Sequence, residues 1–232
     1  FSGRMQDWRA RLSAEVAGGQ VPAGAWSGEF LGGDSAARIV ALTGNTLDGE
    51  IKAQGDVFWA PQPRWSIIAT GDALNPGVWM PDVPGQMSFE LATEGAVAES
   101  GEPQATLALS RAVGVLAGRP VDLIAEAALV GQRVTLEQFS AASGDNSASG
   151  SGTVSGDQLA LQWRLSAPRL DSLLPDASGS LTASGTIGGT TGQPHLELSA
   201  AGRALTLADV QIATLDAEVR AGLDAADPLS VS

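Results

Sequence analysis

The feature that most constrains the fold is a period-two alternation of apolar and polar residues, which recurs along almost the whole chain. Leu159, Leu161, Trp163 and Leu165 alternate with residues that include Gln162. The same pattern recurs at 8–16, 51–59, 121–129, 181–187, 195–199 and 215–220. Successive side chains of a strand point to opposite faces, so each segment would have one apolar and one polar face. The sequence therefore predicts an all-β protein.

Turn-forming residues separate these segments. Gly, Asn and Asp adopt the positive φ angles that tight hairpins require. We expect roughly 14 short strands in an antiparallel meander. The expected turns lie at 18–19, 32–34, 47–49, 75–77, 83–85, 144–146 and 188–189.

One segment allows two interpretations. Met5, Trp8, Leu12 and Val16 also fit the spacing of one helical face, with Gly18 as a possible C-terminal cap. We favour a strand for residues 5–16, because Ala10 and Ala14 extend the alternation.

An internal repeat suggests how the strands are organised. Pro81 to Met87 resembles Pro175 to Leu181, and each copy continues into an alternating strand. The two copies cover approximately residues 44–110 and 144–200. Repeats of this kind indicate an array that grows by adding strands. We therefore expect residues 1–232 to form a single continuous sheet segment of a longer exported protein, since the sequence starts at Phe1.

The composition excludes several kinds of function. The chain has 232 residues, a net charge of −13, no cysteine and one histidine. An anionic surface disfavours a nucleic-acid partner, and cysteine chemistry is impossible. No run of apolar residues is long enough to span a membrane as a helix. We expect no cofactor and no metal.

Candidate catalytic groups are few. His195 lies on the polar side of its segment, out of phase with Leu196 and Leu198. Neighbouring carboxylates such as Asp216 and Glu218 are better explained as surface residues than as a glycosidase pair. We therefore expect that the chain is not an enzyme.

The apolar positions of the alternating segments are the best candidates for a functional surface. Apolar side chains on one face of a curled sheet could hold a lipid tail without any catalytic group. The same residues could instead close onto each other as the core of a sandwich, and the residues alone leave both options open. The expected lining residues are Leu12, Ile51, Val57, Ile67, Phe89, Leu91, Leu123, Leu129, Leu159, Leu161, Leu181, Ile187, Leu196, Leu198, Leu215 and Val219, with Trp8, Trp65 and Trp163 as possible aromatic contacts.

Three features together resemble the TamB (AsmA-like) family. They are the repeated alternating strands, the Pro-Asp-x-x-Gly motif at 81–85 and 175–179, and Gly-Gln-Pro at 192–194 before a strand. The segment from Trp163 to Gly185 carries the closest resemblance, which covers most of residues 40–232.

This resemblance implies a fold and a function. The fold would be an elongated, curled antiparallel sheet, a β-taco or half-pipe with an apolar inner face. The parent protein would be anchored in the bacterial inner membrane, and this segment would lie in the periplasm. It would contact phospholipid acyl chains and carry phospholipid towards the outer membrane. The parent would also support outer-membrane protein assembly together with an outer-membrane barrel partner.

Two other functions are compatible with an acidic, cysteine-free β protein. One is a surface adhesin or autotransporter passenger, although the repeats near 20 residues typical of a β-helix are not visible. The other is a carbohydrate-binding sandwich that uses surface tryptophans.

Overall fold

The computed structural model describes residues 2–4, 6–17, 22–174, 176–208 and 210–222. These residues form two compact units. The N-terminal unit comprises residues 1–120 with 129–131, and the C-terminal unit comprises residues 121–128 with 132–232. Strands dominate both units, and the described helices are two short 3₁₀ turns. None of the described helices is long and apolar enough to cross a membrane.

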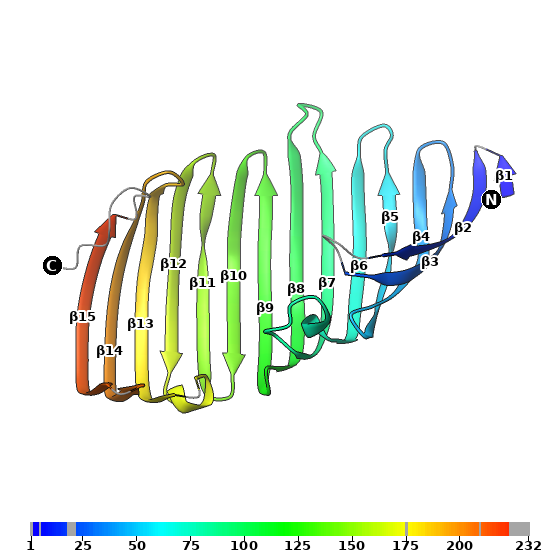
Figure 1. The fold of residues 1–232 in the computed structure, drawn as a ribbon. Coiled ribbons are helices and arrows are strands. Elements are labelled where there is room, and N and C mark those ends of the chain that lie inside the picture. The colour runs from blue at the N-terminus through cyan, green and yellow to red at the C-terminus, as the bar shows by residue number, and fades with distance from the viewer. Residues whose placement is uncertain (1, 5, 18–21, 175, 209, 223–232) are drawn as a thin grey trace. The chain divides into compact units, whose positions relative to one another are not determined.

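In the N-terminal unit, each strand pairs antiparallel with the next one in the chain (Figure 1). This order is the meander that the alternation and the turn residues predict. The strands are β1 (Ser2–Arg4), β2 (Asp7–Val16), β3 (Gly24–Gly32), β4 (Ala36–Thr46), β5 (Gly49–Phe58), β6 (Arg64–Leu74), β7 (Gly85–Val97) and β8 (Pro103–Leu116), with the 3₁₀ turn η1 (Pro76–Val78) between β6 and β7.

The C-terminal unit repeats this arrangement. Its strands also follow chain order, and they pair antiparallel from β10 onwards (Figure 1). Strand β9 (Arg119–Val130) contributes residues to both units. The others are β10 (Arg133–Ser143), β11 (Asn146–Ser155), β12 (Gln158–Ala167), β13 (Ala177–Thr190), β14 (Pro194–Leu207) and β15 (Val210–Gly222), with the 3₁₀ turn η2 (Leu170–Ser172) between β12 and β13.

The expected fold class is confirmed: the protein is all-β, with a curled antiparallel sheet. Figure 1 shows the β2–β3 ribbon bending and passing in front of β5 and β6, so the N-terminal unit curves. Right-handed strand twist and β-bulges produce such bending. The ambiguous segment at 5–16 is a strand over its described part, Asp7–Val16.

Several of the expected turns are present, and the prediction of one turn is wrong. Leu47 and Asp48 have φ angles of 53° and 58° and connect β4 to β5, as a two-residue hairpin requires. Gly188 and Gly189 do not form a turn but lie inside β13, where they pair with His195 and Pro194. The expected turn at 18–19 lies outside the described residues.

The two loops after β6 and β12 occupy equivalent places in the two units. Each contains a 3₁₀ turn and leads into a long strand, β7 or β13. The Pro-Asp-x-x-Gly segment at 81–85 lies between η1 and the start of β7, and residues 176–179 of the second such segment lead into β13. Both units thus contain a strand, a loop with a 3₁₀ turn and a long strand in the same order.

Little of either sheet is buried in a core. The accessible surface is 14598 Å², whereas a compact monomer of 23.5 kDa would expose about 9,800 Å². Among the described residues, the buried hydrophobic side chains are Leu74, Ala112, Ala167, Leu170, Ala177 and Leu205. A closed sandwich would bury the inward-facing residues of every strand. The paired strands of each unit form one sheet with few buried side chains, so neither unit by itself is a closed sandwich.

Candidate functional site

The strand registers show which side chains share a face. Residues that are direct partners in an antiparallel pair have side chains on the same side of the sheet. In the C-terminal unit, Leu161 pairs with Gly152 and Ile187, and Ile187 pairs with Leu196. In the N-terminal unit, Ala69 pairs with Leu91. Each unit thus has one side that consists of the apolar positions of its strands.

We call this side the apolar face of each unit. On β2 to β8 it contains Trp8, Leu12, Trp26, Phe30, Ile39, Leu42, Ile51, Val57, Trp65, Ile67, Leu74, Met87, Phe89, Leu91, Leu107 and Leu109, interspersed with Ala, Gly and Thr. On β10 to β15 it contains Val134, Leu136, Phe139, Val154, Leu159, Leu161, Trp163, Leu165, Leu181, Ile187, Leu196, Leu198, Leu205, Ile212, Leu215 and Val219, again with small residues between them.

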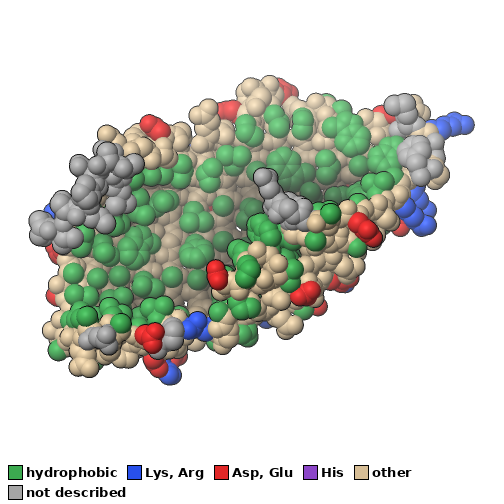
Figure 2. All heavy atoms as spheres, in the orientation of Figure 1, with side chains coloured by type: hydrophobic (Ala, Val, Ile, Leu, Met, Phe, Trp, Pro, Cys, Tyr) green, Lys and Arg blue, Asp and Glu red, His purple; other side chains and the backbone are tan. Residues whose placement is uncertain are grey.

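On these paired strands the registers place no Asp, Glu, Lys, Arg or His on the apolar face. Figure 2 shows hydrophobic side chains gathered over the strands of each unit, with charged side chains mostly towards the margins. Most of these hydrophobic residues are half-buried, and Leu12 is 60% exposed. Exposed apolar surface of this extent is typical of a binding surface.

The opposite, polar face carries the ion pairs. Arg38 Nε lies 2.8 Å from Asp56 Oδ1, and Arg220 Nε lies 3.6 Å from Glu197 Oε1. The hydrogen bond with Asp56 raises the pKa of Arg38, and contact with Glu50 raises the pKa of Lys52. These pairs are solvent-exposed, so each contributes little stability. On the paired strands, these charged side chains are thus separated from the apolar face and lie on the other side of each sheet.

The expected lining residues fall on one side of their own unit. Leu12, Ile51, Val57, Ile67, Phe89 and Leu91 share the apolar face of the N-terminal unit with Trp8 and Trp65. Leu159, Leu161, Leu181, Ile187, Leu196, Leu198, Leu215 and Val219 share that of the C-terminal unit with Trp163. Leu123 and Leu129 are both half-buried on β9, where alternation gives them a common side of the strand.

Sequence reasoning missed other members of the apolar face. Ile39 and Leu42 are three residues apart, yet both lie on it because a β-bulge separates them. A bulge also brings Leu136 and Phe139 onto the same side. The strict period of two is broken at such points. The sequence did contain a signal for Trp26 and Phe30, because each lies two residues from Gly28, which is the spacing of positions on one face of a strand.

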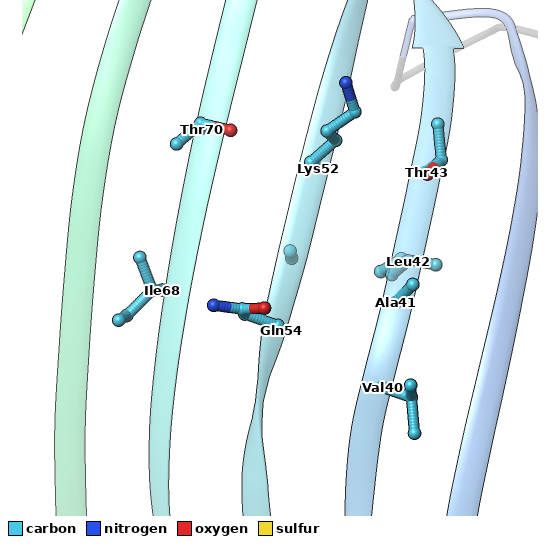
Figure 3. Close-up of a pocket in the computed structure, with 9 residues that line it drawn as sticks. Val40, Ala41, Leu42, Thr43, Lys52, Gln54, Ile68 and Thr70 are labelled. Carbon is cyan, nitrogen blue, oxygen red and sulfur yellow. The ribbon is translucent and has the colours of Figure 1, made fainter.

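A pocket on β4, β5 and β6 lies outside the apolar face (Figure 3). Its lining includes Lys52, Gln54 and Thr70, whose register places them on the polar face. Val40 and Ile68 are exposed there. The pocket is formed where the Ile39–Leu42 bulge displaces β4. None of the expected lining residues lines this pocket, and of the residues that do, Leu42 and Ala53 belong to the apolar face.

The candidate polar sites have structural explanations. The side chain of Asn146 is buried and makes hydrogen bonds with Ser143, Arg169 and Ser172, so the turn at 144–146 ties a hairpin to the η2 loop. His195 lies on the polar face of β14, opposite Gly188. Within the described part of the chain, no group of three or more His, Cys, Asp or Glu residues could hold a metal ion.

The comparisons with known proteins agree with this arrangement. The family model described as "TamB, N-terminal domain" matches residues 1–226. A curated relative, the "Translocation and assembly module subunit TamB" of Haemophilus influenzae, is 26% identical over 216 residues. The match covers 92% of this chain and 16% of the relative. No solved structure matches. The chain therefore belongs to the TamB family, through the region described as the TamB N-terminal domain.

Proposed function

We propose that this chain is a lipid-carrying segment of a periplasm-spanning bridge, in which phospholipid acyl chains lie along the apolar face. The observation that supports this most directly is the uncharged apolar face in each unit, whose side chains are mostly half-buried rather than enclosed in a core. The TamB relative is named as a subunit of a translocation and assembly module, which is consistent with such a role.

The energetics favour lipid tails as the occupant. Each methylene removed from water contributes about 0.8 kcal/mol, so a tail of about 16 carbons would contribute on the order of 12 kcal/mol. A charge along the path would interrupt this gain, because it would lose hydration without a partner. The face offers uninterrupted apolar and small side chains across paired strands. No catalytic group is required.

The wider role is proposed for the full-length protein. There the parent would be anchored in the inner membrane, partner an outer-membrane barrel and support assembly of outer-membrane proteins. The chain spans 16% of the length of the curated relative, so these activities also depend on other regions. Membership in the TamB family favours transport and assembly over the passenger alternative.

The experiment uses photocrosslinking in cells that express the full-length protein. A photoreactive residue at Leu161 or Phe89, on the apolar face, should capture phospholipid. A photoreactive residue at Gln162 or Glu90, one position along and on the polar face, should not, because neighbouring side chains of a strand point to opposite sides. Mass spectrometry of the adducts gives the result. Equal capture at both kinds of position would contradict the proposal.

A further inference from the structure

The tryptophans of the apolar faces occur opposite glycines. In four strand pairs, the residue directly across from a tryptophan on the following strand is glycine. In each case the indole lies against that glycine, in the position that a Cβ would occupy or contact. The four pairs are Trp8–Gly32, Trp26–Gly44, Trp65–Gly95 and Trp163–Gly185.

The indole rings lie so close to these glycines that they leave no room for a Cβ atom. A Cβ added to Gly32 would lie 2.1 Å from Cζ2 of Trp8, and one added to Gly44 would lie 2.5 Å from Cε3 of Trp26. Carbon atoms in van der Waals contact are about 3.5–4.0 Å apart, so the rings use space that any other residue would fill. Gly185 differs, because a Cβ there would also lie 2.2 Å from the carbonyl oxygen of Glu197.

The pair Trp65–Gly95 shows how the ring is held. A Cβ at Gly95 would lie 2.2 Å from Cζ2 of Trp65, and its three nearest atoms all belong to that indole. Trp65 Nε1 donates a hydrogen bond to Thr93 Oγ1 at 3.3 Å, and Thr93 Oγ1 donates to the carbonyl oxygen of Thr106 at 2.9 Å. The indole therefore lies across β7, with its N–H fixed to the same strand as Gly95.

We propose that Gly32, Gly44 and Gly95 are positioning residues that keep the indoles flat on the sheet and so preserve the space above the apolar face for acyl chains. This inference rests on the proposed lipid-carrying function. A flat indole offers a broad apolar surface and little height. A side chain under it would tilt the ring away from the backbone, into the path of the lipid. The glycines thus determine how deep a ligand can lie.

The test places a photocrosslinker at Ile67, which shares the apolar face with Trp65, in the full-length protein in cells. Gly95→Ala should lower the phospholipid adduct about threefold or more, because the added methyl group takes the place of the indole and lifts the ring from the strand into the space above the sheet. Trp65→Ala should keep the adduct. The double variant Trp65→Ala/Gly95→Ala should return to the level of Trp65→Ala, since the added methyl group then has room. Gly222→Ala is the control, because a Cβ there meets nothing within 4 Å.

The outcomes separate this inference from the function on which it depends. An unchanged adduct in Gly95→Ala would overturn the positioning role while leaving the lipid-carrying function intact. A loss of adduct that persists in the double variant would also overturn the positioning role. It would mean that the added methyl group disturbs the backbone of the sheet rather than the indole of Trp65. Absence of phospholipid adducts in the otherwise unaltered protein would overturn both proposals.

Discussion

At the scale of single residues, two asparagines hold the loops of the repeat in place. Asn75 Oδ1 accepts hydrogen bonds from the backbone N–H groups of Gly77 and Gly85. Asn146 has the corresponding task in the C-terminal unit, where its Oδ1 accepts from the Arg169 N–H at 3.1 Å. Both side chains accept hydrogen bonds from backbone N–H groups in or next to these loops. One amide side chain thus fixes part of the backbone in or next to each loop through hydrogen bonds.

Asn146→Ala should destabilise the η2 loop. The substitution removes the hydrogen bond from Nδ2 to Ser172 Oγ at 2.7 Å and leaves the Arg169 N–H without its partner. Each of these part-buried hydrogen bonds contributes about 0.5–1.5 kcal/mol to stability. Faster amide hydrogen exchange in β11 and around η2 would reveal the loss. Asn45→Ala, at an exposed position, is the control; an equally large effect there would contradict the explanation.

At the scale of elements, bulges keep the apolar faces in phase. Between Ser178 and Ser180 the register of β13 against β14 shifts, and Gly179 has a φ of 95°. The shift allows Ala177 and Leu181 to lie on the same side as Leu205. Together with the η2 loop, these residues form a small cluster of Ala167, Leu170, Ala177 and Leu205. It is the one hydrophobic core cluster found among the described residues.

Leu205→Ala should destabilise the C-terminal unit by about 3 kcal/mol, because Leu205 is 2% exposed and truncation leaves a cavity. Hydrogen exchange of the β13–β15 amides under denaturant measures the effect in that unit. Leu207→Ala is a matched control on the same strand, and it should cost under about 1 kcal/mol because Leu207 is 44% exposed. Similar losses in both variants would show that the cluster does not stabilise the unit.

At the scale of the whole molecule, the main property is the separation of charge from apolar surface. The net charge of −13 is carried by the polar faces, the loops and the ends of the chain, while the apolar faces of the paired strands carry none. The large accessible surface is consistent with this separation, because few hydrophobic side chains among the described residues are buried in a core. Stability in such a fold comes mainly from strand pairing and contacts between neighbouring strands.

Leu161→Asp should impair lipid contact more than it impairs folding. A carboxylate on the apolar face removes contact with about two methylenes, roughly 1.6 kcal/mol, which corresponds to about a fifteenfold loss of phospholipid adduct at a photocrosslinker placed at Leu198. Gln162→Asp puts the same charge on the polar face and should leave the adduct unchanged. Thermal unfolding of both variants checks the fold, and equal adduct yields would contradict the role of the face.

The sequence by itself determined the local structure. Alternation such as Leu159, Leu161, Trp163 and Leu165 specifies a strand and its two faces, because the direction of a side chain follows from backbone geometry alone. For the same reason the expected lining residues of each unit lie on a common side. The sequence pattern did not predict that Ile39 and Leu42 share a face, because a bulge lies between them. It wrongly predicted a turn at Gly188 and Gly189, which lie inside a strand.

Only the tertiary structure decided how far the apolar side of each unit is covered by other residues of that unit. An open curled sheet and a closed sandwich require the same alternation in each strand, since they differ only in what covers the apolar side. The half-buried state of Leu161, Ile187 and Leu198, and the packing of indoles on glycines such as Gly95, depend on contacts between separate strands. A pattern within one strand carries no information about those contacts.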